Sequence, residues 1–337
     1  MITAMRHWQS VLFGLAIVSL TLNIATIARA QLASVRAGYG GTAGYQLPLW
    51  LNREAGFAQK YGIDLEILLI GAGSLNMQAL VGGSIQFSQN SASAAIQAAL
   101  KGVPVVIIAT QESKIPFQII ARPEIKDPQQ LRGRRIGTSR FGGSGDTAIQ
   151  SALKAWKIDP RDVKILQSGS TAARISALTL GHIDATIFSY PEIFYARKLG
   201  MNLLGDVGDF FSYPNTSLIV VRSFLEKQRS LVKNMLKAQI EAIHTIRTNK
   251  ELTLRIMKKY LKVNDPEAID ATYGFFAPRM LELPRADTEG VKNILADFGA
   301  LQRSPNDFLD MTLLDELERE GFFQRLSGNQ SKSSKDN

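Results

Sequence analysis

The chain of 337 residues repeats part of itself. A shift of 98 positions aligns residues 64–102 with residues 162–200 without a gap, and 11 of the 39 aligned positions are identical. Ordinary amino-acid composition would give roughly two or three identities over this length. The chain is therefore predicted to build one structural unit twice, and this duplication limits the folds that it can adopt.

Hydrophobic periodicity indicates what the repeated unit is. Each copy begins with a short apolar strand, at residues 34–38 in the first copy and 135–138 in the second. A loop with glycines, a helix and two further strand–helix pairs follow in both copies. Strands that alternate with helices of this length are typical of βαβ units with right-handed crossovers. We predict an α/β protein of two lobes, each a mostly parallel sheet with flanking helices.

Apolar runs outside the repeat predict how the chain passes between the lobes. Residues 104–111 form a predicted buried strand, residues 116–124 a crossing to the second lobe, and residues 217–223 the return. Helical periodicity dominates from residue 224 onward, and the polar, low-complexity end is expected to be disordered. The predicted organisation is a first lobe at 31–118 and 218–326, a second lobe at 119–217, and a disordered tail at 327–337.

The first 30 residues have the pattern of an export signal. Arg6 precedes an apolar run, and Ala28-Arg29-Ala30 is a cleavage site of the small-x-small kind. We predict a signal peptide at 1–30 that is cleaved after Ala30. An uncleaved membrane anchor is the alternative, because the apolar run is about long enough to span a bilayer. A large exported protein without cysteine agrees with a periplasmic location.

Composition and missing motifs exclude several functions. The absence of cysteine excludes disulfides, thiol nucleophiles and thiolate metal sites. The net charge is +9, but the basic residues are scattered, so we expect no nucleic-acid partner. No G-x-S-x-G motif, phosphate-binding loop or metal-ligand spacing occurs, and His182 and His244 lie far from the predicted ligand side of the strands. We expect no metal, no cofactor and no enzymatic activity.

The predicted ligand site lies beyond the carboxyl ends of the strands, where helix N-termini point. Two such lobes would share one cleft. Ser74 and Ser144 stand at predicted helix starts, where each could bind a ligand oxygen or only cap its helix. Aromatic side chains could enclose an organic ligand, and Arg140 could pair with a carboxylate or sulfonate. The candidate ligand-binding residues are Thr42, Tyr45, Ser74, Asn90, Ser91, Gln111, Arg140, Phe141, Ser144 and Tyr190.

Five segments in order resemble a known family. They are LPLWLNREAGFAQKYGIDLEI, GSLNMQALVGGSIQF, AALKGVPVVIIA, DPQQLRGRRIGTSRFGGSGD and LTLGHIDATIF, the last followed by Pro191. From about residue 35 to residue 326 the chain resembles the periplasmic solute-binding proteins of ABC importers of the nitrate, sulfonate and taurine type. Members that bind amino-sulfonates often have an acid just before this proline. Tyr190 stands there in this chain, which speaks against taurine-like zwitterions.

The resemblance implies a type II periplasmic binding protein fold that closes on a small molecule. The expected function is the substrate-binding subunit of an ABC importer. It would capture a small anionic or neutral organic solute, of the sulfonate, nitrate, carboxylate or pyrimidine class, in the periplasm. It would deliver this solute, as a monomer, to an inner-membrane permease that works with a separate ATPase. An exported ligand-sensing module and a periplasmic enzyme on the same fold are the alternatives.

Overall fold

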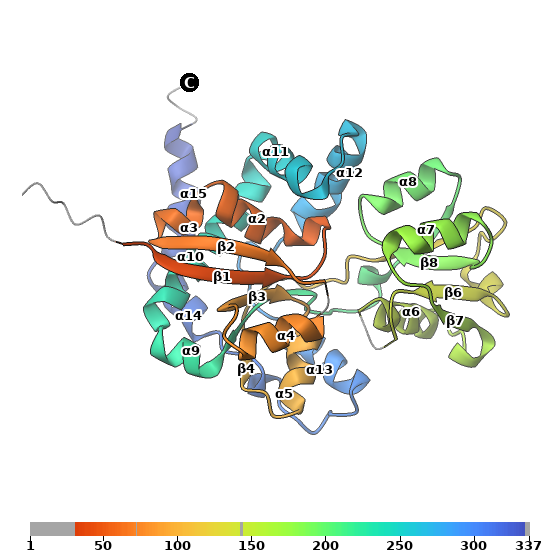
Figure 1. Cartoon of the computed structure of the whole chain (residues 1–337), viewed down its shortest axis with the longest axis horizontal. Helices are drawn as coiled ribbons and strands as arrows, with labels where there is room; N and C mark the ends of the chain where they lie inside the picture. Colours follow the sequence, from red (N-terminus) through yellow and green to blue (C-terminus); the bar gives the residue numbers. More distant parts are fainter. Residues whose placement is uncertain (1–30, 72, 142–143, 334–337) are drawn as a thin grey trace, which may run out of the picture. The chain divides into compact units, whose positions relative to one another are not determined.

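Two five-stranded mixed sheets with flanking helices organise the chain (Figure 1), so the predicted α/β class is confirmed. The computed structural model describes residues 31–71, 73–141 and 144–333. The first sheet has the order β2-β1-β3-β10-β4 and the second the order β7-β6-β8-β5-β9. The strands are β1 (Ala33–Tyr39), β2 (Ile63–Leu69), β3 (Phe87–Asn90), β4 (Val105–Glu112), β5 (Gln118–Ala121), β6 (Arg135–Thr138), β7 (Lys164–Gln167), β8 (Ala185–Phe188), β9 (Asn202–Asp206) and β10 (Thr216–Val221).

The two sheets repeat one strand order, as the internal repeat predicts. Strand β1 pairs with β3 in parallel, and β6 pairs in parallel with β7 and β8. The crossing strands run the other way, because β10 is antiparallel to β3 and β4, and β5 is antiparallel to β8 and β9. Each sheet is therefore mostly parallel, as predicted, with one reversed crossing strand, β10 or β5, that makes it a mixed sheet.

The helices of the two copies follow the predicted places with one difference. A single predicted helix after β1 is two helices, because Gly56 has φ +75° and ends the first of them. Pro48 in the first turn of the first helix suits a helix start. These helices are α2 (Leu47–Glu54), α3 (Phe57–Lys60), α4 (Gly73–Val81), α5 (Ala92–Leu100), α6 (Ser144–Ala155), α7 (Thr171–Thr179) and α8 (Glu192–Lys198).

The chain after β10 is helical. Asp265 and Asp287 each accept two backbone N–H bonds at a helix start, which fixes where two of these helices begin. They are α9 (Arg222–Lys227), α10 (Arg229–Thr248), α11 (Lys250–Leu261), α12 (Pro266–Phe276), α13 (Thr288–Asp297), α14 (Thr312–Arg319) and α15 (Phe322–Ser333). Short 3₁₀ turns are η1 (Gly44–Gln46), η2 (Pro128–Leu131), η3 (Pro160–Asp162), η4 (Val207–Asp209), η5 (Ala277–Arg279) and η6 (Pro305–Asp307).

Two predictions concern the ends of the chain. The tail expected to be disordered from residue 327 is helical as far as Ser333, where α15 ends. The predicted signal peptide at 1–30 lies outside the described residues, as do residues 334–337. Within the described part, no helix is both long and apolar enough to cross a membrane.

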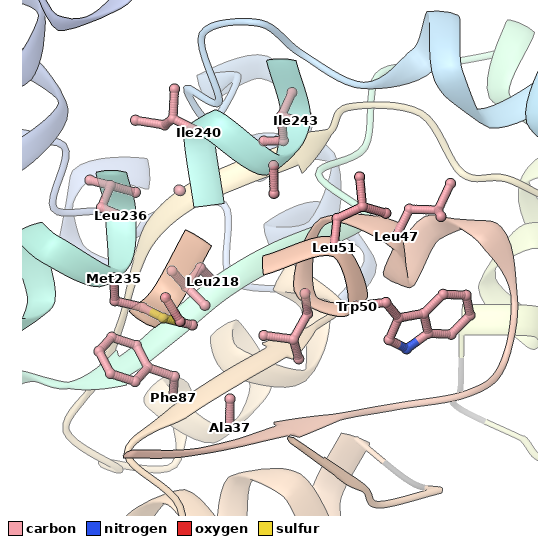
Figure 2. Close-up of a cluster of buried hydrophobic side chains, with 14 of the residues drawn as sticks. Ala37, Leu47, Trp50, Leu51, Phe87, Leu218, Met235, Leu236, Ile240 and Ile243 are labelled. Carbon is pink, nitrogen blue, oxygen red and sulfur yellow. The ribbon is translucent and has the colours of Figure 1, made fainter. Parts of the chain in front are cut away.

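Helix α10 covers one face of the first sheet with an apolar surface (Figures 1 and 2). Leu236 and Ile240 of this helix lie over strand residues such as Phe87, and all three are buried. The indole of Trp50 on α2 stacks on the Tyr260 ring of α11, with centroids 4.8 Å apart. This contact joins the two helices above the sheet.

The opposite face packs on α4, α5 and α13. The apolar cluster on this face contains Ile107 of the first sheet and Ile119 and Ile136 of the second. The two sheets thus share part of their hydrophobic core, and the described residues from Ser34 onward form one compact unit.

We expect Leu236→Ala to lower the free energy of unfolding by about 2–5 kcal/mol, because it removes buried methyl groups from the α10 packing surface. The matched control is Leu180→Ala, since Leu180 is 70% exposed and the change should stay within about 0.5 kcal/mol. Urea-induced unfolding followed by circular dichroism measures both. Equal effects of the two substitutions would contradict the assignment of Leu236 to the core.

Candidate functional site

A polar cavity of about 50 Å³ lies where strands of both sheets end. Ser91 follows β3, and Ser144 begins α6 after β6, so each sheet contributes a loop from the carboxyl end of a parallel strand. This is the position that the strand–helix pattern predicts for a ligand. The lining residues are Gly40, Tyr45, Gln46, Asn90, Ser91, Phe117, Ser144, Asn215 and Thr216.

The structure brings four of the predicted residues to this cavity: Tyr45, Asn90, Ser91 and Ser144. The Ser91 hydroxyl accepts a 3.3 Å hydrogen bond from the Ser93 backbone N–H and so caps α5. The Asn90 carboxamide oxygen accepts from the Ser91 N–H at 2.8 Å. The Asn90 Nδ2 group is buried and has no hydrogen-bond partner among the described residues. It is a donor available to a ligand in the cavity wall.

Tyr45 lies against the loop that leaves β1. Its hydroxyl is 3.5 Å from the Gly40 carbonyl oxygen, and a Cβ on Gly41 would stand 2.5 Å from the same hydroxyl. Gly41 has φ +101°, a conformation that glycine tolerates best. Burial, with the negative charges of Glu192 and Glu112, raises the pKa of Tyr45 above its usual value. The hydroxyl therefore stays protonated and can donate.

Other predicted residues lie elsewhere. Ser74 is exposed and lines a separate, largely apolar groove between α4 and α5. Thr42, Arg140 and Phe141 are exposed, and Phe141 keeps 59% of its surface in solvent. The glycines at 142 and 143, expected to approach a ligand, lie outside the described residues. The cavity that Ser144 lines does not include any of the four exposed residues Thr42, Ser74, Arg140 and Phe141.

Two predicted residues, Gln111 and Tyr190, lie within the packed interior or against other side chains and do not line the cavity. Gln111 is fully buried in β4, and its carboxamide has no partner among the described residues. The Tyr190 ring packs on the Phe275 ring of α12, with centroids 4.9 Å apart and planes at 33°. Tyr190 thus connects the start of α8 to the C-terminal helices instead of lining the cavity.

Sequence reasoning missed the neutral lining residues Gln46, Phe117, Asn215 and Thr216. Phe117 and Asn215 directly precede the crossing strands β5 and β10, and Thr216 begins β10, so a search around the starts of those strands could have found all three. Gln46 ends the 3₁₀ turn before α2 and has no distinctive sequence signal.

Two acidic residues near the cavity were also missed. Glu112 ends β4 and is fully buried, and its carbonyl accepts the Asn215 N–H at 3.0 Å. Burial raises the pKa of the Glu112 carboxyl to about 8, although Arg279 and Asn215 oppose this change. Burial also raises the pKa of Glu192, which follows Pro191. Glu112 is therefore mostly neutral at pH 7.

An ion pair joins the C-terminal helices to the second sheet. Arg279 in η5 donates to Asp206 at the end of β9 at 2.6 Å, and the two side chains are 17% and 14% exposed. Gln118 Nε2 also donates to the Asp206 carboxylate at 3.0 Å. The Arg279 guanidinium lies 3.6 Å from the centre of the Phe275 ring, a cation–π contact. This charge pair is one of the polar contacts that hold the two sheets together.

No group of His, Cys, Asp and Glu side chains in the described ranges could hold a metal ion. The cavity offers hydroxyl, amide and backbone groups. These groups can donate and accept hydrogen bonds, and the two mixed α/β sheets with flanking helices have the periplasmic binding protein fold.

The chain belongs to the NMT1/THI5-like family, whose sequence pattern matches residues 44–251. A Brucella abortus protein named as a candidate binding protein is 27% identical over 305 residues, which cover 86% of this chain and 93% of that protein. The aliphatic sulphonate-binding protein SsuA of Escherichia coli has a TM-score of 0.70 at 17% identity, over 84% of this chain and 99% of that one. The nitrate-binding protein NrtA of Synechocystis has a TM-score of 0.64 at 17% identity, over 89% of each chain.

Glu112 should make stability fall as pH rises. Its pKa is about 8 in the folded chain and near 4.5 when unfolded, so the folded state binds the extra proton between these values. Each pH unit in this window costs about 1.4 kcal/mol of folding free energy. We expect Glu112→Gln to gain about 4 kcal/mol relative to the parent chain between pH 5 and pH 8.5. Urea unfolding at the two pH values measures this, and parallel pH profiles would contradict it.

Proposed function

We propose that this chain is the solute-binding component of an ABC importer. It captures a small anionic or neutral organic solute in the periplasm and delivers it to a membrane permease. The cavity carries this proposal: Ser91 at the start of α5 and Ser144 at the start of α6 line the same polar space. The solved structures of similar fold that are named as sulphonate- and nitrate-binding proteins support it.

The electrostatics of the cavity favour an anionic group on the ligand. The first N–H groups of a helix have no partner in the helix, and the helix dipole adds positive potential there. Helices α5 and α6 have 9 and 12 residues, and both start at this cavity. The Asn90 amide adds a donor, and neutral Glu112 does not repel an anion at pH 7. A sulfonate, nitrate or carboxylate group fits these donors.

The size of the cavity limits what it can enclose as it stands. A volume of about 50 Å³ compares with the ~10–15 Å³ that a cavity needs to hold one water molecule. It holds an oxyanion group rather than a complete large molecule. The remainder of an organic solute would need the loops to separate. The ligand class therefore narrows to small solutes with a compact charged or polar head group.

Contacts from both sheets explain how binding favours a closed protein. Ser144 follows a strand of the second sheet, whereas Asn90 ends a strand of the first and Ser91 follows it. A ligand that touches both sides binds the closed arrangement more tightly than an open one, and this difference shifts the population toward closure. The closed monomer would then dock on the permease, and a separate ATPase would power release. The predicted lobes, 31–118 with 218–326 and 119–217, would be the two sides of this movement.

Isothermal titration tests the ligand class. The mature chain is titrated with nitrate, methanesulfonate, a carboxylate such as acetate, a pyrimidine, and a primary amine as the cationic control. We expect heat from at least one anionic or neutral solute and none from the amine. Binding of the cation alone would overturn the proposal. Mass spectrometry of the solute recovered from the protein after prolonged incubation checks that it is bound without chemical conversion.

Substitutions at two helix starts test the position of the site. Ser144→Asp places a negative charge in the cavity, and we expect affinity for an anionic solute to fall at least tenfold, about 1.4 kcal/mol. Ser74→Asp is the matched control, because Ser74 is near the start of α4 but lines a different groove. The affinity of the Ser74→Asp variant for the same solute should stay within twofold of the parent chain, a margin of about 0.4 kcal/mol. Equal losses would place the site elsewhere.

A further inference from the structure

Four buried carboxamides form a continuous chain of hydrogen bonds behind the cavity. Asn52 Nδ2 donates to Gln239 Oε1 at 3.2 Å, and Gln239 Nε2 donates to Gln89 Oε1 at 2.5 Å. Gln89 Nε2 donates to Gln46 Oε1 at 2.6 Å, and Gln46 Nε2 donates to the Gly40 carbonyl at 3.1 Å. We call these four side chains the amide relay. Each is at most 1% exposed.

The amide relay has one direction, and Gly40 sets it. A backbone carbonyl oxygen can only accept, so Gln46 must turn its NH₂ group toward Gly40 and its oxygen toward Gln89. Gln89 must then present its own NH₂ group to Gln46, and Gln239 must do the same for Gln89. Turning any one carboxamide around would bring two oxygens or two NH₂ groups together. The orientation of all four groups is therefore coupled.

The relay ends in the wall of the proposed ligand site. Gly40 and Gln46 both line the cavity, while Gln239 lies in the middle of α10 on the covered face of the first sheet. Gly40 stands just beyond the end of β1, where the strand ladder no longer holds the backbone. The relay supplies the shorter of two side-chain hydrogen bonds to the Gly40 carbonyl, since the Tyr45 hydroxyl lies 3.5 Å from the same oxygen. Gln89 Nε2 also lies 3.3 Å from the Gln46 carbonyl oxygen, which holds the backbone of the η1 turn.

We propose that Gln239 and Gln89 are positioning residues for the ligand site, acting through Gln46 on residues 40–46. This inference rests on the proposed function for its consequence in binding. Its structural part, the control of the loop, stands without it. Hydrogen bonds in a low-dielectric chain strengthen one another, so the loss of one member weakens those that follow. A residue of α10 that touches no ligand would in this way determine how well the cavity is preformed.

Hydrogen exchange of the full mature chain tests the loop directly. Gln239→Met keeps the length of the side chain but removes the donor to Gln89 and the acceptor for Asn52. Gln89→Glu keeps an acceptor for Gln239 and removes the donor to Gln46. We expect both variants to exchange the backbone amides of residues 40–46 about five- to tenfold faster, as expected for one lost net hydrogen bond.

The matched control is Thr253→Val. Thr253 is fully buried and donates to the Asn249 carbonyl at 2.8 Å on α11, outside the relay. This variant should lose stability without faster exchange in residues 40–46. If Gln239→Met behaves like Thr253→Val, with lower stability and an unchanged loop, the relay is only a satisfied polar part of the core and the inference is wrong. If Gln89→Glu does not fold, Gln239→Met alone decides.

Binding supplies the second readout, with methanesulfonate and nitrate as probes. We expect Gln239→Met to weaken the binding of either probe about tenfold, as the loss of one hydrogen bond to the loop would do, while Thr253→Val leaves it unchanged. If the parent chain binds neither probe nor any other anion, the proposed function fails, and the exchange data still judge the relay. If the loop loosens but affinity does not change, the positioning role in binding is refuted.

Discussion

The backbone ladder of β10 positions most of the cavity. This strand enters the first sheet between β3 and β4, with Ser217 opposite Asn90 and Thr216 opposite Glu112. The return crossing thus brings residues about 100 positions apart in the chain to one edge of the sheet. Asn90 and Thr216 line the cavity, and Glu112 is buried beside them, because of this register. A slip of β10 by one residue would turn Thr216 to the opposite face of the sheet and change its neighbours on β3 and β4.

The crossing of the chain between the two sheets also determines which contacts join them. On one side the two sheets share an apolar cluster that includes buried Ile115 and Tyr213 of the crossing segments. Elsewhere the contacts include the largely buried Arg279–Asp206 pair, the exposed Lys198–Glu267 pair between α8 and α12, and the Tyr190–Phe275 ring contact. Exposed ion pairs contribute little and exchange readily with water, whereas separating a shared apolar cluster exposes hydrophobic surface. Opening of the ligand site would thus separate the polar contacts and bend at the crossings.

The duplication in the sequence predicted the fold well because sheet packing repeats whenever strand and helix lengths repeat. It predicted the site only in part, since the loops after successive parallel strands of one sheet are not equally close to the crossing strand β10. Asn90 ends β3, which is adjacent to β10, Ser91 follows it, and both line the cavity. Ser74 follows β2, which lies at the sheet edge with β1 and β3 between it and β10, so its helix start faces another groove. Strand order, which a single sequence does not specify, separated the two cases.

The acids and amides at this end of the sheet were harder to predict because burial changes their protonation and their hydrogen-bond partners. Glu112 appears in the sequence as an acid after an apolar run, a pattern typical of a solvated strand end, but in the folded chain it is buried and largely neutral at pH 7. Gln89 stands between the polar residues Ser88 and Asn90, a pattern typical of an exposed strand end, yet both Gln89 and Gln239 are buried. A purely apolar core would pack more simply here, since each buried amide needs a partner in a fixed orientation. That requirement gives the four amides one common direction, which ends at the loop where a ligand would bind. This part of the core is therefore less stable than an apolar one would be, and it defines the geometry of the cavity.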